Sequence, residues 1–233
     1  TRWATHGAPN DTNAHPHESS DGSFALVHNG IIENYTALRQ SLTDRGYSFK
    51  SQTDTEVLVR LIEDVLKTTG LSLGKAIQQA LSQVKGTYGI AVVSSEDPDM
   101  LIAARKGSPL ILGVGNGEYF LGSDAAPIIE YTRQVVYLND GELVIVRRDG
   151  FKVFSVENVA LNKTIHELEW DLEQIEKGGY EHFMLKEIME QPQALENAMR
   201  GRVREELPFI KLGGLLDHID SLREAKRIII CAC

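Results

Sequence analysis

Between residues 34 and 84 apolar side chains recur every three or four positions, which is the spacing of an amphipathic helix. The spacing predicts helices at residues 34–45, 57–66 and 73–84. Asn34 and Gly46 are suitable end residues for the first helix. Thr53 and Glu56 match a capping box ahead of the second.

From residue 88 onward the apolar residues come in short runs bounded by Gly, Asp, Asn or Pro, a pattern typical of β-strands. We expect strands at residues 88–94, 100–105, 109–114, 119–123, 135–139, 142–147 and 151–156. Asn116-Gly117 and Asp149-Gly150 predict hairpin turns. Helices followed by mainly antiparallel strands predict an α+β fold in which helices cover the sheets.

An earlier apolar run, residues 24–27, leads through His28 into the pair Asn29-Gly30. Asn-Gly predicts a sharp turn, because Gly accepts positive φ freely and Asn tolerates it. The simpler interpretation of this stretch alone is a β-hairpin. The functional alternative is an oxyanion hole, because the Asn29 amide and the Gly30 N–H would be two fixed donors at the end of a buried strand.

The last third of the chain returns to a helical pattern. We expect a helix at residues 164–178 with a capping box at its start, a linker near residues 178–182, and a helix at 183–191. Pro192 suits the first turn of a new helix. A helix at 215–225 and an apolar strand at 227–233 then predict the opening of an α/β domain with a parallel sheet.

Composition narrows the class of protein. Of 233 residues 42% are hydrophobic, so the chain can bury a sizeable core, and its net charge of -9 argues against nucleic acid or an anionic membrane as partner. No apolar run approaches the roughly 20 residues that span a bilayer, and no signal peptide opens the sequence. The two cysteines, Cys231 and Cys233, are too few and too close to staple a fold, which favours a reducing, cytoplasmic compartment.

Candidate chemistry is concentrated near the start of the chain. Arg2 suits bidentate binding of a carboxylate, and Trp3 can cover a small ligand, although an ordinary polar strand is the simpler interpretation of residues 1–7 alone. Asp54 is either a helix-start carboxylate favoured by the macrodipole or a partner for a ligand's ammonium group.

Four histidines, His6, His15, His17 and His28, suggest a metal-dependent hydrolase as an alternative. The spacing His15-Pro-His17 lacks the pattern of a zinc motif, so hydrogen-bonding structural histidines are favoured and we expect no metal.

Three separated motifs, residues 1–7, 28–34 and 53–57, together resemble the class II glutamine amidotransferases, which are N-terminal-nucleophile hydrolases. Residues 186–192 and 227–233 are similar to the interdomain segment and first isomerase strand of the branch that aminates a sugar phosphate. The resemblance implies a four-layer αββα glutaminase domain at residues 1–178, incomplete at its start, a linker at 179–190, and a truncated sugar isomerase domain at 191–233.

The resemblance also implies roles for the site residues. Arg2 would bind the α-carboxylate of glutamine and Asp54 its α-ammonium group. Trp3 would gate the pocket and an ammonia channel, and Thr5 and His6 would complete the pocket wall. Asn29 and Gly30 would form the oxyanion hole. No cofactor is implied. The second substrate would be fructose 6-phosphate, bound mostly outside this chain, and the parent would be a homodimer or larger oligomer.

One departure from the family pattern is the nucleophile, an N-terminal cysteine that this sequence lacks. Thr1 is not a start methionine and aligns beside the ligand-binding arginine instead, and residues 228–233 stop inside a predicted strand. We therefore expect an inactive fragment of a longer enzyme. Amidophosphoribosyltransferase-type or asparagine-synthetase-type amidotransferases, and a non-catalytic glutamine-binding module, remain alternatives.

Overall fold

A computed structural model describes residues 6–168, 180–199, 219–227 and 229. The chain divides into two compact units, Thr1–Leu172 and Glu173–Cys233. Each unit is described by itself, beginning with the first.

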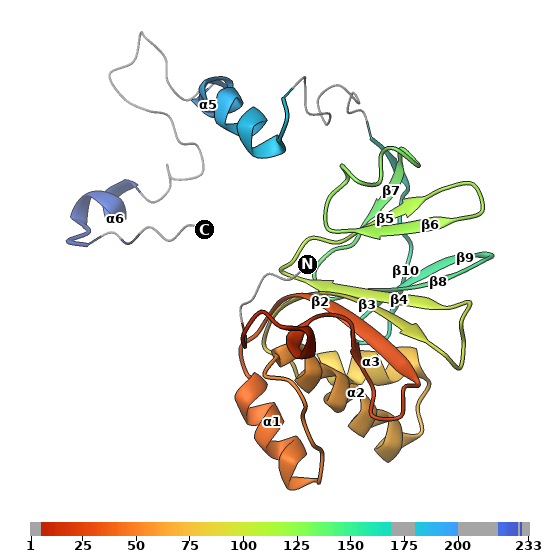
Figure 1. Cartoon of the computed structure of the whole chain (residues 1–233). Helices are drawn as coiled ribbons and strands as arrows, with labels where there is room; N and C mark the ends of the chain where they lie inside the picture. Colours follow the sequence, from red (N-terminus) through yellow and green to blue (C-terminus); the bar gives the residue numbers. More distant parts are fainter. Residues whose placement is uncertain (1–5, 169–179, 200–218, 228, 230–233) are drawn as a thin grey trace. The chain divides into compact units, whose positions relative to one another are not determined.

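The first unit is built on two antiparallel sheets (Figure 1). The large sheet has seven strands in the order β1-β2-β3-β4-β8-β9-β10. Their bounds are β1 His17–Glu18, β2 Phe24–Ile32, β3 Gly86–Ser94, β4 Leu101–Lys106, β8 Glu142–Arg147, β9 Gly150–Ser155 and β10 Ala160–Leu161. The small sheet has the order β11-β7-β5-β6, with β5 Ile111–Val114, β6 Tyr119–Gly122, β7 Gln134–Tyr137 and β11 His166–Glu167.

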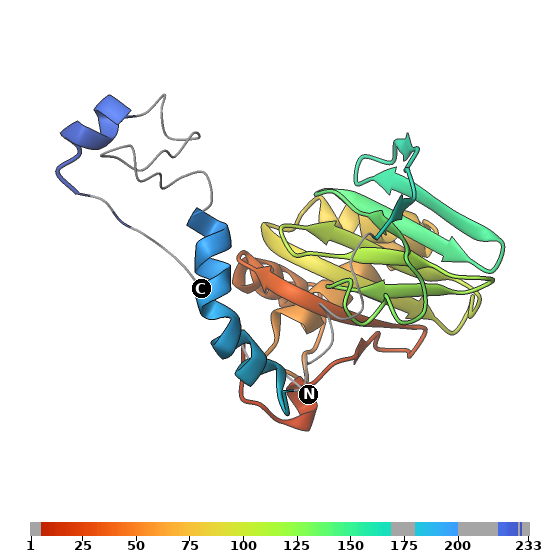
Figure 2. The same cartoon turned by 90° about the horizontal axis from the view of Figure 1, so that it is seen from above.

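Three helices cover one face of the large sheet, and the small sheet lies on its other face (Figures 1 and 2). The helices are α1 Tyr35–Asp44, α2 Asp54–Thr69 and α3 Leu73–Leu81, preceded by a short 3₁₀ turn at Asp11–Asn13. One hydrophobic core lies between helices and sheet, and α2 is its most buried helix. A second core lies between the sheets. The described residues therefore form three layers of the predicted αββα sandwich, and the α+β class is confirmed.

Most of the predicted elements of this unit are confirmed. All seven strands expected between residues 88 and 156 are present, as are the three helices. The Thr53 side chain accepts a hydrogen bond from the Glu56 N–H at 3.1 Å, as a helix cap should. The Glu56 carboxylate turns to the N–H groups of Lys50 and Ser51 at 2.9 and 2.6 Å, so only half of the expected capping box forms.

The predicted turn at Asn29-Gly30 is wrong, because β2 runs straight through both residues. Gly30 pairs with Tyr88 of β3, and its φ of 141° excludes most other residues. A Cβ atom at Gly30 would also lie 2.3 Å from the Thr87 carbonyl oxygen. Close approach of the β3 backbone, and not a hairpin, is what requires glycine here.

The start of the helix predicted at residues 164–178 is also wrong, because residues 164–168 are not helical. The remainder of that prediction, residues 169–178, lies outside the described residues. His166 and Glu167 form β11 and pair with Val135 and Gln134 of β7. Pairing with a strand distant in sequence overrides the local capping pattern. The hairpin at β8–β9 is confirmed, but its turn is Arg148-Asp149, one residue earlier than predicted, because Arg147 pairs with Gly150.

In the second unit, one helix, α5 Phe183–Met199, continues through Pro192, so the break predicted there is wrong. Proline removes one helix hydrogen bond, but its fixed φ is compatible with a helix. The helix α6 spans Ile219–Glu224. Arg227 and Ile229 are not in a strand, and the rest of the strand predicted there lies outside the described residues. Among the helices the structure describes, none is long and apolar enough to cross a membrane.

Candidate functional site

The first turn of α2 brings the predicted acidic residue to the edge of β2. Asp54 is 3% exposed, and its Oδ2 accepts a hydrogen bond of 2.9 Å from the Ile32 N–H. Its Oδ1 lies 3.6 Å from Nδ1 of His6. The carboxylate therefore ties the start of the helix to the end of the strand, and one of its oxygens faces the predicted pocket residue His6.

The same edge of β2 carries the Ile32 N–H, which points toward the first turn of α2, and Gly30 lies two residues earlier on the strand. β1 pairs only with Ala25 and Leu26, so among the described residues this edge has no strand partner beyond them. The side chain of Asn29 is exposed on the face opposite that of His28.

Histidines bind the threonines at the start of α2. Nδ1 of His28 and Nε2 of His15 each lie 3.1 Å from Oγ1 of Thr55. Nε2 of His17 lies 3.0 Å from Oγ1 of Thr53. Burial lowers the pKa of His28 below its ordinary value of 6.5, although the nearby Asp54 opposes the shift, so His28 is neutral near pH 7.

These contacts favour structural histidines over a metal site. Each histidine has a threonine or Asp54 as its partner, along the first turn of α2. Within the described residues, no group of three or more His, Cys, Asp or Glu side chains could hold a metal ion.

A cavity of about 430 Å³ opens beside His6, the residue that Asp54 contacts. His6 lies in its wall and packs edge-on against Tyr35, with ring centroids 4.6 Å apart. Arg39 contributes a cation that sequence reasoning missed, and it is held by the Ser51 carbonyl at 3.1 Å and by the Phe49 ring. The predicted pocket residues Arg2, Trp3 and Thr5 lie outside the described residues.

Buried ion pairs lie along the middle of α2, and the sequence pattern did not predict them. Arg60, 5% exposed, pairs with Glu63 at 2.9 Å and with Glu56 at 3.3 Å. Glu63 also accepts from Lys67 and from the Ser20 hydroxyl. Burial opposes ionisation of Glu56 and Glu63, but their hydrogen bonds outweigh it and hold both pKa values below the ordinary one.

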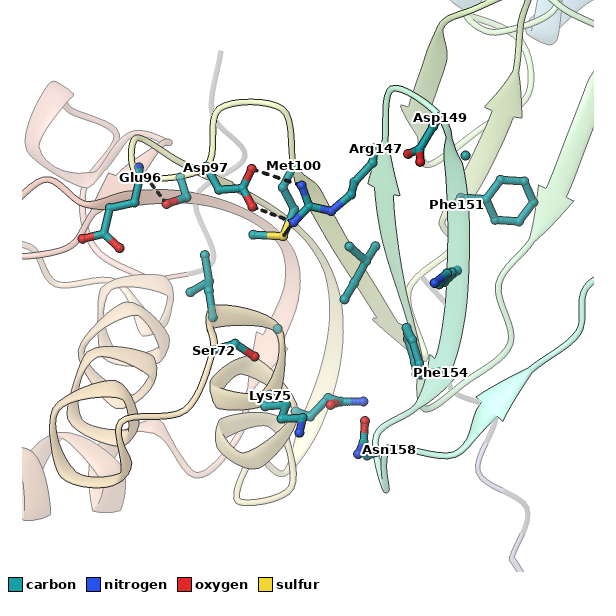
Figure 3. Close-up of a pocket in the computed structure, with 17 residues that line it drawn as sticks. Ser72, Lys75, Glu96, Asp97, Met100, Arg147, Asp149, Phe151, Phe154 and Asn158 are labelled. Atoms are coloured by element: carbon teal, nitrogen blue, oxygen red, sulfur yellow. Dashed lines mark hydrogen bonds and ion pairs between the residues drawn. The ribbon is translucent and has the colours of Figure 1, made fainter.

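A second cavity, of about 720 Å³, lies between α3 and the β8–β9 hairpin (Figure 3). Its rim includes the ion pair of Arg147 with Asp97 at 2.6 Å, drawn in Figure 3 beside Met100. Of the predicted glutamine-site residues that the structure describes, His6, Asn29, Gly30 and Asp54, none lines this cavity.

Comparisons with known proteins agree with the motifs. A family model described as "Glutamine amidotransferase domain" matches residues 4–130. The glutamine–fructose-6-phosphate aminotransferase (isomerizing) of Chlorobaculum tepidum is 58% identical over the whole of this chain, and that of Bacteroides thetaiotaomicron is 52% identical. The protein of the same name from Thermotoga maritima is 46% identical. The chain spans about 38% of the length of these curated relatives.

Solved structures resemble about two thirds of the chain. Glutamine phosphoribosylpyrophosphate amidotransferase from B. subtilis superposes with a TM-score of 0.56 at 26% identity, covering 66% of this chain and 33% of that one. A structure described as an allosteric regulatory enzyme of purine biosynthesis gives a TM-score of 0.52 at 27% identity, covering 62% of this chain and 31% of that one.

Proposed function

The chain belongs to the glutamine amidotransferase domain family, and from this premise we propose that it is part of a glutamine–fructose-6-phosphate aminotransferase (isomerizing). The parent enzyme would hydrolyse glutamine and transfer the ammonia to fructose 6-phosphate, giving glucosamine 6-phosphate and glutamate. The observation that carries the proposal is a match over the full chain, at 46–58% identity, to three aminotransferases of that name.

The site supports glutamine as the first substrate. An amino acid needs an anion for its ammonium group, a cation for its carboxylate and oxyanion donors at the carbonyl under attack. The Asp54 carboxylate faces His6, which lines a cavity, and Gly30 lies two residues before Ile32, whose N–H donates to Asp54. We propose that Arg2 binds the carboxylate, and that Asn29 and Gly30 form the oxyanion hole.

The remaining roles are proposed with it. Trp3 gates the pocket, and Thr5 and His6 complete its wall. The nucleophilic cysteine lies outside this chain, so the chain alone does not hydrolyse glutamine. Residues 1–178 form the glutaminase domain, 179–190 the linker and 191–233 the start of the isomerase domain. The parent is a cytoplasmic homodimer or larger oligomer that supplies the hexosamine pathway.

An amidophosphoribosyltransferase is the second candidate, because its fold is similar. That similarity covers 66% of the chain at 26% identity, whereas the aminotransferases match its whole length at nearly twice that identity or more. The extent of the match therefore favours the aminotransferase.

The test uses the full-length enzyme, with its cysteine-led start and complete isomerase half. Supplied with glutamine and fructose 6-phosphate, it should release glucosamine 6-phosphate. Asp54→Ala should lower kcat/KM for glutamine by about 100-fold or more, because the ammonium group loses its charged partner. Thr68→Val, an exposed change on the same helix, is the control. Glutamine hydrolysis without amino sugar would favour the second candidate, and no hydrolysis would overturn both.

A further inference from the structure

A chain of hydrogen bonds passes beneath the strand position proposed to hold the oxyanion. It runs from His15 through the Thr55 hydroxyl to His28, and from His28 Nε2 to the Thr87 carbonyl at 3.4 Å. Four parts of the unit are joined in this way: the loop before β1, the first turn of α2, β2 and β3. His28 and Thr55 are both buried, so water cannot replace their partners without opening the core.

Each hydrogen bond in this series has a defined donor and acceptor. A carbonyl oxygen only accepts, so the Nε2 of His28 carries the proton that is donated to Thr87. Neutral imidazole has a single N–H, and the Nδ1 of His28 must therefore accept from the Thr55 hydroxyl. The Thr55 oxygen is left to accept from the Nε2–H of His15. Thr55 and His28 each donate one hydrogen bond and accept one within this bridge, so the Thr55 hydroxyl fixes the ring orientation of His28.

This series of hydrogen bonds ends directly under Gly30. A Cβ atom at Gly30 would meet the Thr87 oxygen at 2.3 Å and the Nε2 atom of His28 at 3.0 Å. The two atoms that form the last hydrogen bond of the chain are therefore the two that support the Gly30 backbone. Asp54, beside Thr55 on α2, is held separately by the Ile32 N–H.

We propose that Thr55 is a positioning residue that sets the Asn29-Gly30 segment of β2 relative to Asp54 for glutamine hydrolysis. The proposal rests on the proposed function, because it assigns Gly30 a donor role. Thr55 does not touch the substrate. Its hydroxyl orients His28, and His28 with Thr87 fixes the backbone from which the Gly30 N–H projects.

The test compares variants of the full-length enzyme in glutamine hydrolysis. Thr55→Val keeps the shape of the side chain but removes the hydroxyl, and kcat should fall about 10- to 100-fold because the oxyanion donors are misplaced. KM should change less than about threefold, because Asp54 keeps its own anchor. Thr55→Ser keeps the hydroxyl and should restore kcat to within about threefold of the wild type. Thr68→Val is the matched control, because the Thr68 hydroxyl that it removes bonds to carbonyl groups of its own helix.

A pH profile separates positioning from a loss of folding. The Thr55 hydroxyl stabilises neutral His28, so in Thr55→Val the acidic limb of the kcat profile should move to higher pH. Asp54, His6 and His15 also face this cluster, and they are unchanged in every variant. If Thr55→Val does not fold, Thr55→Ser decides the matter, since a tenfold loss of kcat in that variant would overturn the proposal.

Two other results have separate meanings. A Thr55→Val enzyme with wild-type kcat and an unshifted profile would overturn the positioning role and leave the proposed function intact. A wild-type enzyme without glutaminase activity would overturn the proposed function itself.

Discussion

The two ends of the large sheet differ in what covers them. The difference is clear in one row of residues that are paired across neighbouring strands and share one face of the sheet. The row consists of Val27, Ala91, Ala103, Val144 and Val153, on β2, β3, β4, β8 and β9. At the β4–β8–β9 end, Ala103 and Val144 are fully buried in the core between the two sheets. At the β2 end, Val27 is 41% exposed and Ile31 on the same face is 42% exposed.

The comparison shows how one strand serves two purposes. On the buried face of β2, Phe24, Leu26 and Ile32 pack in the core against the helices. At the β4–β8–β9 end of the sheet, the opposite face is buried as well, in the core against the small sheet. His28 joins that buried face, while Asn29 points from the open one. Alternation along the strand thus separates residues that fix the backbone from the side chain proposed to meet the substrate.

The strongest way to break this arrangement is Gly30→Ala. The new Cβ would collide with the Thr87 carbonyl, and φ at this position is 141°. We expect a loss of about 2–4 kcal/mol in the free energy of unfolding, measured by denaturant unfolding, and no detectable glutaminase activity in the full-length enzyme.

Gly117→Ala is the matched control for this change. Gly117 also has positive φ, at 77°, but a Cβ there meets nothing within 4 Å. Its cost should be only about 1 kcal/mol. Equal losses in the two variants would mean that backbone strain alone, without the approach of β3, accounts for Gly30.

The second test makes the same substitution at an exposed and at a buried valine of the row. Val144→Ala leaves a cavity between the sheets and should cost about 2 kcal/mol. Val27→Ala removes a partly exposed side chain and should cost less than about 0.5 kcal/mol. Urea unfolding of both variants measures the difference. A cost at Val27 as large as that at Val144 would show that the open face of β2 is covered in solution.

Local sequence predicted the elements that local physics decides. Helical spacing located α1, α2 and α3, and punctuated apolar runs located the strands from β3 to β9. The errors arose where distant residues decide. Nothing local distinguishes Asn29-Gly30 in a turn from the same pair inside β2, because the β3 backbone that requires glycine is more than fifty residues away. The same holds for residues 166–167, which pair with β7.

The candidate site divides in the same way. Motif resemblance identified His6 and Asp54, and the structure brings them together. The threonine–histidine contacts escaped prediction because they join residues 27 to 40 positions apart, with no spacing rule to indicate them. Arg39 escaped because its place in the cavity depends on how α1 packs.

The finest test concerns the buried face of β2, where His28 lies in a row with Ile90, Ala104 and Leu143. Burial lowers the pKa of folded His28 below the ordinary 6.5. The unfolded chain therefore takes up a proton first as pH falls, and stability must decline below about pH 6.5. Above that pH His28 is neutral in both states and contributes no pH dependence.

Comparison with His28→Gln isolates this contribution, because His6, His15 and His17 are the same in both proteins. Thermal unfolding between pH 7.5 and 5 should show a smaller fall in Tm for the variant than for the wild type. Parallel curves would mean that His28 titrates like an exposed histidine, and then the β2 end of the sheet would be open to water on both of its faces. A steeper fall in the wild type would instead establish that burial in the folded protein disfavours the charged form of His28.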